Sequence, residues 1–99
     1  MKKLTILYVG RDEGITETMN RLLNVRKEWT GLTACSDGEA LKICRDTEID
    51  LVLLGNGITA DEEGKLIADL KLIKPDIKII QHYGGGSGLL YGEIMSVNF

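Results

Sequence analysis

The sequence predicts an α/β fold in which a parallel sheet carries helices on both of its faces. Short apolar runs at residues 4–9 and 50–54 lack the polar alternation of a half-exposed strand, which is typical of strands buried on both faces. Each run is followed by a segment with apolar residues at helical spacing, and this alternation indicates strand–helix–strand units. The chain has 99 residues, which supports one domain and one core.

The first strand is predicted at residues 4–9, where apolar and β-branched residues form a run that Gly10 ends. A helix follows, with apolar residues at helical spacing: Ile15, Met19, Leu22 and Leu23. Asp12 or Thr16 is the predicted cap of this helix, because both side chains can accept a hydrogen bond from a backbone N–H group of the first turn.

A second, weaker strand is predicted at residues 32–35, and the helix after it begins at a cap formed by Ser36 or Asp37. The apolar face of this helix is formed by Ala40, Leu41, Ile43 and Cys44. The third strand, at residues 50–54, is the clearest buried strand of the chain, and Gly55 ends it.

The third helix is predicted over residues 61–74, and Pro75 marks its end. A fourth strand is predicted at residues 77–80. The acidic residues 61–63 suit the first turn of a helix, where they complement the helix dipole, better than they suit a metal site.

Composition excludes several classes of function. The formal net charge is −3, which argues against nucleic-acid binding as the main task. No apolar run approaches the ~20 residues that span a bilayer, so we expect a cytoplasmic protein without membrane contact. Cys35 and Cys44 are then expected to be reduced, buried thiols. Trp29 either covers one end of the core or anchors a partner.

The order and spacing of these segments resemble those of a two-component response-regulator receiver domain. The segments that carry the resemblance are residues 6–9 with Asp12 and Glu13 after them, 34–41, 49–54, Gly64 and 74–80. The resemblance implies a three-layer flavodoxin-like fold with strand order 2-1-3-4 in the parallel sheet. The fifth strand of the family is missing or replaced. We expect a single domain, 1–99, with a receiver-like core over 1–83 and an atypical segment over 84–99.

In the family that the chain resembles, an aspartate at the end of the third strand accepts a phosphoryl group beside Mg²⁺, which neutralises the developing charge. The position that matches this aspartate is Gly55, and the positions that match the acid pair are Gly10 and Arg11. Asp12 matches a third acid often found there. Arg11 could itself occupy the space of the metal.

The family's Ser or Thr after the fourth strand matches Tyr83, or His82 if the register shifts by one residue. No lysine after a fifth strand can be matched. The sequence therefore predicts no catalytic residue, no bound metal and no cofactor, and it predicts that the protein is not an enzyme. A phosphorelay receiver with a non-standard site stays open as an alternative.

A glycine run offers a further alternative, a small anion- or nucleotide-binding module. Backbone N–H groups can cradle an anion, and the residues concerned are Gly84, Gly85, Gly86 and Ser87. The run lacks the Gly-Lys-Ser/Thr ending of a P-loop, so a flexible turn is the other interpretation.

The missing fifth strand predicts a protein–protein contact. The fourth strand would be an open edge with Ile79 on it, and Leu89, Leu90 and Ile94 lie in the apolar segment that follows. We expect a homodimer formed by these residues, because closed two-fold pairing is the commonest way to cover such an edge. The alternative is a monomer in which this segment folds back over its own fourth strand. The predicted function is a non-phosphorylatable pseudo-receiver that binds an unidentified protein in signal transduction or transcription control.

Overall fold

The computed structural model describes residues 4–25, 27–55 and 57–81, which alternate between strands and helices. The elements in chain order are β1 (Leu4–Val9), α1 (Glu13–Leu23), β2 (Trp29–Ala34), α2 (Asp37–Asp46), β3 (Leu51–Leu54), α3 (Ala60–Ile73) and β4 (Lys78–Gln81). Strands and helices alternate as the sequence predicts. Within these described ranges no helix is long and apolar enough to cross a membrane.

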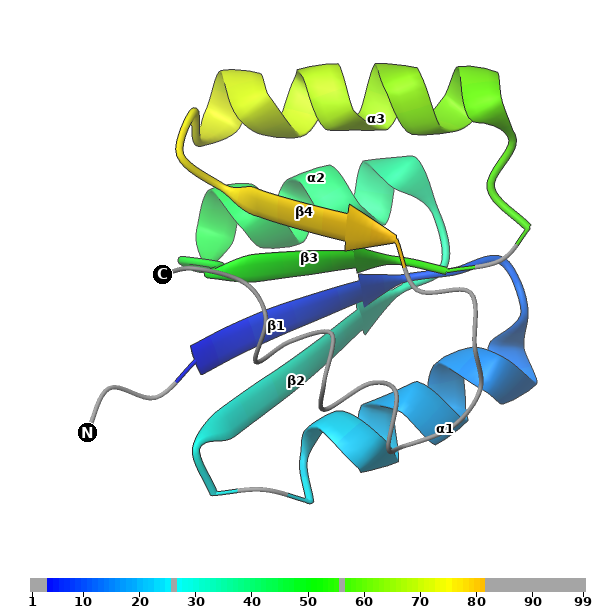
Figure 1. Cartoon of the computed structure of the whole chain (residues 1–99), viewed down its shortest axis with the longest axis vertical. Helices are drawn as coiled ribbons and strands as arrows, with labels where there is room; N and C mark the ends of the chain where they lie inside the picture. The colour runs from blue at the N-terminus through cyan, green and yellow to red at the C-terminus, as the bar shows by residue number, and fades with distance from the viewer. Residues whose placement is uncertain (1–3, 26, 56, 82–99) are drawn as a thin grey trace.

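The strands form one four-stranded parallel sheet in the order β2-β1-β3-β4. Helices α2 and α3 cover one face of the sheet and α1 lies on the other (Figure 1). The predicted fold class and strand order are therefore confirmed. The register aligns Ala34 with Val9, Val9 with Leu54 and Leu54 with Gln81 across the sheet, so these residues form its last row at the carboxyl edge.

The core has two parts because side chains alternate between the faces of each strand. Leu7, Val9 and Leu54 point to the face that α2 and α3 cover, where they pack with Leu66 and Leu70. The opposite face, beside α1, contains a second cluster: Ile6, Tyr8, Met19, Leu23, Trp29, Leu51 and Leu53. Position 8 of β1 thus points away from α2 and α3.

Both ends of β2 differ from the sequence prediction. β2 begins at Trp29, three residues before the predicted start, because its pairing with β1 runs back to Leu4. Trp29 is only 5% exposed, so it belongs to the core. β2 ends at Ala34, which leaves Cys35 outside the strand and exposed. The expectation of a buried Cys35 is wrong, and Cys44 is half-buried.

Each helix begins at a side-chain cap that lies at the carboxyl edge of the sheet. The Asp12 carboxylate accepts from the Ile15 backbone N–H group at 2.9 Å, and the Ser36 hydroxyl accepts from that of Glu39 at 3.2 Å. Of the predicted alternatives, Asp12 and Ser36 are therefore the caps. α3 begins one residue earlier than predicted, because Thr59 caps it in a reciprocal capping box with Glu62.

Charged side chains at the amino edge of the sheet bind backbone groups. The Asp50 carboxylate accepts from the Thr5 backbone N–H group at 2.9 Å, and the Asp50 N–H group donates to the Thr5 carbonyl at 2.8 Å. Lys74, which caps the end of α3, donates from Nζ to the Ile49 carbonyl at 2.8 Å. These contacts fix the start of β3 against β1 and against the end of α3.

Candidate functional site

The carboxyl edge of the sheet gathers the residues that the sequence singled out as site positions. Gly10, Arg11 and Asp12 follow β1, and Gly55 follows β3. The two glycines extend the sheet by one residue, because the Gly10 N–H group donates to the Ala34 carbonyl at 3.1 Å and the Gly55 N–H group to the Val9 carbonyl at 2.8 Å. Ligands of open parallel sheets bind beyond this edge, so it is the candidate site.

Tyr8 fills the space beside Gly55. A Cβ atom added at Gly55 would lie 2.0 Å from the Tyr8 hydroxyl oxygen and 2.5 Å from Cζ of the ring. Real Cβ atoms do not approach other atoms so closely, so no side chain fits at position 55 while the tyrosine ring stays in place. Tyr8 is 2% exposed and belongs to the core cluster beside α1.

Gly10 borders the same ring on the other side. A Cβ atom at Gly10 would lie 2.7 Å from Cε2 of Tyr8 and 3.0 Å from its hydroxyl oxygen. The two glycines at the ends of neighbouring strands therefore accommodate one phenol group. Because positions 8 and 10 share a face of β1, a larger residue at either glycine would displace the ring.

The surroundings of Tyr8 keep its hydroxyl group protonated. Burial raises the pKa of Tyr8 above its ordinary value, and the nearby Asp12 carboxylate and Cys35 thiol raise it further. A neutral phenol at this edge carries no charge that could hold a cation. It is also a weak nucleophile at neutral pH.

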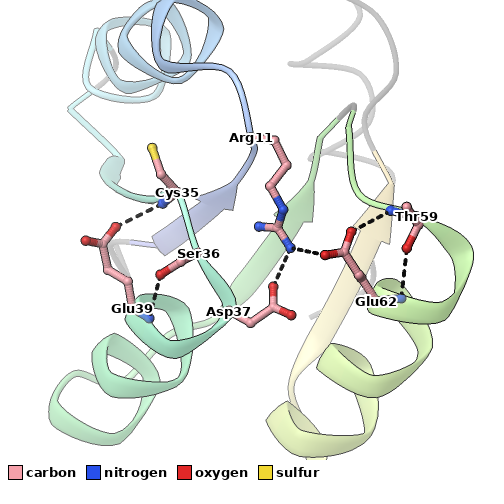
Figure 2. A network of polar contacts seen from close by, with 7 residues as sticks. All are labelled: Arg11, Cys35, Ser36, Asp37, Glu39, Thr59 and Glu62. Atoms are coloured by element: carbon pink, nitrogen blue, oxygen red, sulfur yellow. Dashed lines mark hydrogen bonds and ion pairs between the residues drawn. The ribbon is translucent and has the colours of Figure 1, made fainter.

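Arg11 points to the opposite side of the edge, toward α2 and α3. Its Nη2 atom lies 2.6 Å from Oδ1 of Asp37 and 3.7 Å from Oε2 of Glu62. Figure 2 shows the guanidinium group between the first turns of the two helices. Nη1 of Arg11 is buried without a hydrogen-bond partner among the described residues.

Glu62 takes part in two interactions at once. Its carboxylate accepts from the Thr59 backbone N–H group at 3.1 Å and also faces Arg11. Hydrogen bonds with the backbone and the side chain of Thr59, and the charge of Arg11, lower the pKa of Glu62. The side chain is therefore ionised at neutral pH and oriented toward Arg11 (Figure 2).

The residues at this edge do not fit the Mg²⁺ ion that the resemblance implies. Mg²⁺ is bound through carboxylate oxygens, but positions 10 and 55 have no side chain. The Asp12 carboxylate caps α1 and that of Asp37 pairs with Arg11. In the described part of the chain, no group of three or more His, Cys, Asp or Glu side chains could hold a metal ion.

Several predicted site residues lie outside the described residues. These are His82, Tyr83, Gly84, Gly85, Gly86, Ser87, Leu89, Leu90 and Ile94. Their predicted roles at the phosphorylation site, in anion binding and in the interface stay predictions. Ile79 lies in β4, at the edge of the described sheet. Its side chain is partly buried and packs against the core cluster between the sheet and helices α2 and α3.

Sequence reasoning missed two residues of this edge. In the sequence Tyr8 is one member of an apolar run, and the glycines that end β1 and β3, Gly10 and Gly55, are the signal that space is left beside it. Gln81 ends β4 and donates a hydrogen bond from its amide to the Glu63 carboxylate. A pairing register is needed to place either residue, and the sequence alone does not provide one.

Solved structures of receiver domains share the fold of this chain. A CheY-like response regulator receiver domain protein from Methanospirillum hungatei has 22% sequence identity and a TM-score of 0.72, and the match covers 96% of this chain and 74% of that one. The signal receiver domain of an HD domain-containing protein from Pseudomonas fluorescens has 22% identity and a TM-score of 0.71, with 96% and 75% covered.

A third similar structure is the non-phosphorylated HemR receiver domain from Leptospira biflexa, with 24% identity, a TM-score of 0.68, and 96% and 77% of the two chains covered. No protein-family model matches the sequence. No curated protein matches it either. The chain therefore has the receiver fold, and the structural resemblance that the sequence predicted is confirmed.

Proposed function

We propose that this protein is a pseudo-receiver, a receiver-fold module that cannot be phosphorylated and that acts through protein–protein contacts in signal transduction or transcription control. The observation that carries the proposal is the Tyr8 hydroxyl group, which lies 2.0 Å from the Cβ position of residue 55. The acceptor carboxylate of a receiver would have to occupy that space. A receiver fold that lacks the acceptor carboxylate can still act by binding other proteins through its surface.

Incubation with a small phosphodonor and MgCl₂, followed by intact-mass measurement, tests this proposal. We expect no phosphoryl adduct on the wild-type chain. We also expect none on Gly55→Asp, because a carboxylate added at position 55 still lacks the metal that neutralises charge on the phosphoryl group. A stoichiometric adduct on the wild-type chain would refute the proposal and favour a receiver with a non-standard site.

Calorimetric titration with MgCl₂ is the matching test of the metal site. The donor set at the carboxyl edge predicts no saturable binding in the micromolar range, because Asp12 and Asp37 already have partners and position 55 has no carboxylate. Micromolar Mg²⁺ binding by the wild-type chain would contradict the proposal. The measurement does not depend on any phosphodonor, so it is an independent check.

We further propose that the partner includes a second copy of this chain, bound through β4 and the segment after it. β4 has only β3 as a neighbour within the described sheet, and Ile79 and Ile80 on it are partly buried. Exposed strand edges pair with other chains unless something covers them. Leu89, Leu90 and Ile94 would add apolar area to this interface.

Light scattering at micromolar concentration tests the dimer. We expect the mass of two chains for the wild type, and dissociation when Leu90→Asp is combined with Ile94→Asp. A single-chain mass for the wild type would contradict the homodimer while leaving the absence of phosphorylation untouched. A folded dimer that survives both substitutions would place the interface elsewhere.

A further inference from the structure

Arg11 connects the segments that follow three neighbouring strands. It lies in the loop after β1, its guanidinium group contacts Asp37 at the start of α2, and it faces Glu62 in the first turn of α3. The side chain thereby connects residues 26 and 51 positions further along the chain by charged contacts, as Figure 2 shows. Among the described residues, both ion pairs at the carboxyl edge are formed by Arg11, and the third, between Lys74 and Glu48, lies at the amino edge.

The stem of Arg11 also packs against the loop after β3. A Cβ atom at Gly57 would lie 3.0 Å from Cβ and 3.3 Å from Cγ of Arg11, so the loop backbone passes directly over this stem. Gly57 has a φ of 92°, a backbone conformation that favours glycine. The backbone at Gly57 therefore lies against Arg11 two residues before the Thr59 cap of α3.

Acidic side chains gather at the starts of α2 and α3. Asp37 and Glu39 lie in the first turn of α2, and Asp61, Glu62 and Glu63 in that of α3. These carboxylates suit their own helix dipoles, but the two groups repel each other where the helix starts approach. Of the basic side chains in the described residues, Arg11 is the one with ion pairs to both helices.

We propose that Arg11 has the structural role that a bound cation would have at this edge. Its charge links Asp37 to Glu62 and so holds the backbone at Gly57 against the starts of α2 and α3. A guanidinium group suits this task because it stays charged at every physiological pH and offers several donors in fixed directions. The arrangement of the edge then needs neither a divalent ion nor a phosphoryl group. This inference rests on the contacts of Arg11 and does not depend on the proposed dimer or on a signalling role.

Amide hydrogen exchange of residues 57–63 tests the proposal, with the amides of β1 and β3 as an internal reference for global stability. Arg11→Met keeps an unbranched stem over Gly57 and removes the charge, whereas Arg11→Lys keeps the charge. We expect exchange of the loop amides to become roughly fivefold to tenfold faster in Arg11→Met and to change less than about threefold in Arg11→Lys. Arg45→Met, at an exposed arginine of α2, is the matched control and should leave the loop unchanged.

Two further measurements separate charge from packing. Asp37→Asn should reproduce part of the effect of Arg11→Met, and the two substitutions together should add little, because they remove the same contact. Excess EDTA or millimolar MgCl₂ should not alter loop exchange in the wild type. Equal loop protection in Arg11→Met and the wild type, or a marked gain of protection with MgCl₂ in the wild type, would overturn the proposal.

Discussion

The two edges of the sheet use charged residues in different ways. At the amino edge, Asp50 and Lys74 bind the backbone groups of Thr5 and Ile49 and so fix strands and a helix end to each other. At the carboxyl edge, Arg11 binds side chains from two helices and Tyr8 fills the space between two glycines. The contacts at the first edge hold elements of the fold together, whereas the second edge has the position of a ligand site and is occupied by the protein's own groups.

The fold and the carboxyl edge depend on different residues. The strand order is that of a receiver fold, and the two core clusters that support the sheet consist of apolar residues in the strands and helices. The carboxyl edge depends on a few residues just beyond the strands. A side chain at this edge needs only to fit the space left by its neighbours, as Tyr8 does between Gly10 and Gly55.

The largest effect is expected from Gly55→Asp at the carboxyl edge. The new side chain would overlap the Tyr8 hydroxyl group and bury a carboxylate without a partner, so we expect a loss of about 3 kcal/mol or more in the free energy of unfolding. Urea denaturation followed by circular dichroism measures it. Gly38→Asp is the matched control, because nothing lies within 4 Å of its Cβ position, and it should change stability by less than about 0.5 kcal/mol.

At the amino edge, Asp50→Ala should have a smaller effect. It leaves the Thr5 backbone N–H group without its side-chain acceptor, and we expect a loss of about 1–2 kcal/mol in urea denaturation. Asp46→Ala, at an exposed aspartate that ends α2, is the control and should be close to neutral. If Asp50→Ala were as costly as Gly55→Asp, the contrast between the edges would not hold.

Most of the fold could be predicted from the sequence because the central strands β1 and β3 are short, mostly apolar runs and the segments between strands show helical periodicity. Residues 4–9 and 51–54 show this, since their prediction needed no tertiary information. β2 was predicted too short because its polar and glycine residues obscure the pattern before Leu32, whereas pairing with β1 decides its start. Tertiary pairing overrides local propensity in such strands.

The sequence could predict where the residues of the candidate site lie, but not which side chains contact each other there. The sequence indicated that Gly10, Arg11 and Gly55 meet at one edge, since the carboxyl ends of parallel strands lie together. It could not show that Tyr8 reaches Gly55, because this needs the register of β1 against β3 and the rotamer of the ring. Nor could it show which of the acidic residues would pair with Arg11.

The caps of the helices offer a third, smaller test at the carboxyl edge. Thr59→Ala removes the hydroxyl acceptor of the capping box that also orients Glu62, and we expect a loss of about 1 kcal/mol. Thr18→Ala, at an exposed threonine within α1, is the control and should change stability by less than about 0.5 kcal/mol. Equal effects of the two substitutions in thermal unfolding would argue against the cap.

The smallest expected effect is the pH dependence contributed by Glu62. Its pKa in the folded chain is lower than the ordinary value of 4.5, so its stabilising contribution is complete above that value and is lost as the pH falls through the lowered pKa. The stability difference between the wild type and Glu62→Gln should therefore shrink from about pH 6 to about pH 3. A difference that stays constant over this range would show that the charge of Glu62 is not involved.

The central claim is that the Tyr8 ring fills the space at position 55, and a double-mutant cycle tests it most directly. Gly55→Ala should cost about 2 kcal/mol or more in the wild-type background, because its Cβ atom meets the Tyr8 hydroxyl group. In a Tyr8→Val background, which removes the ring, the same substitution should cost less than about 0.5 kcal/mol. Equal costs of Gly55→Ala in the two backgrounds, measured by urea denaturation, would contradict the account.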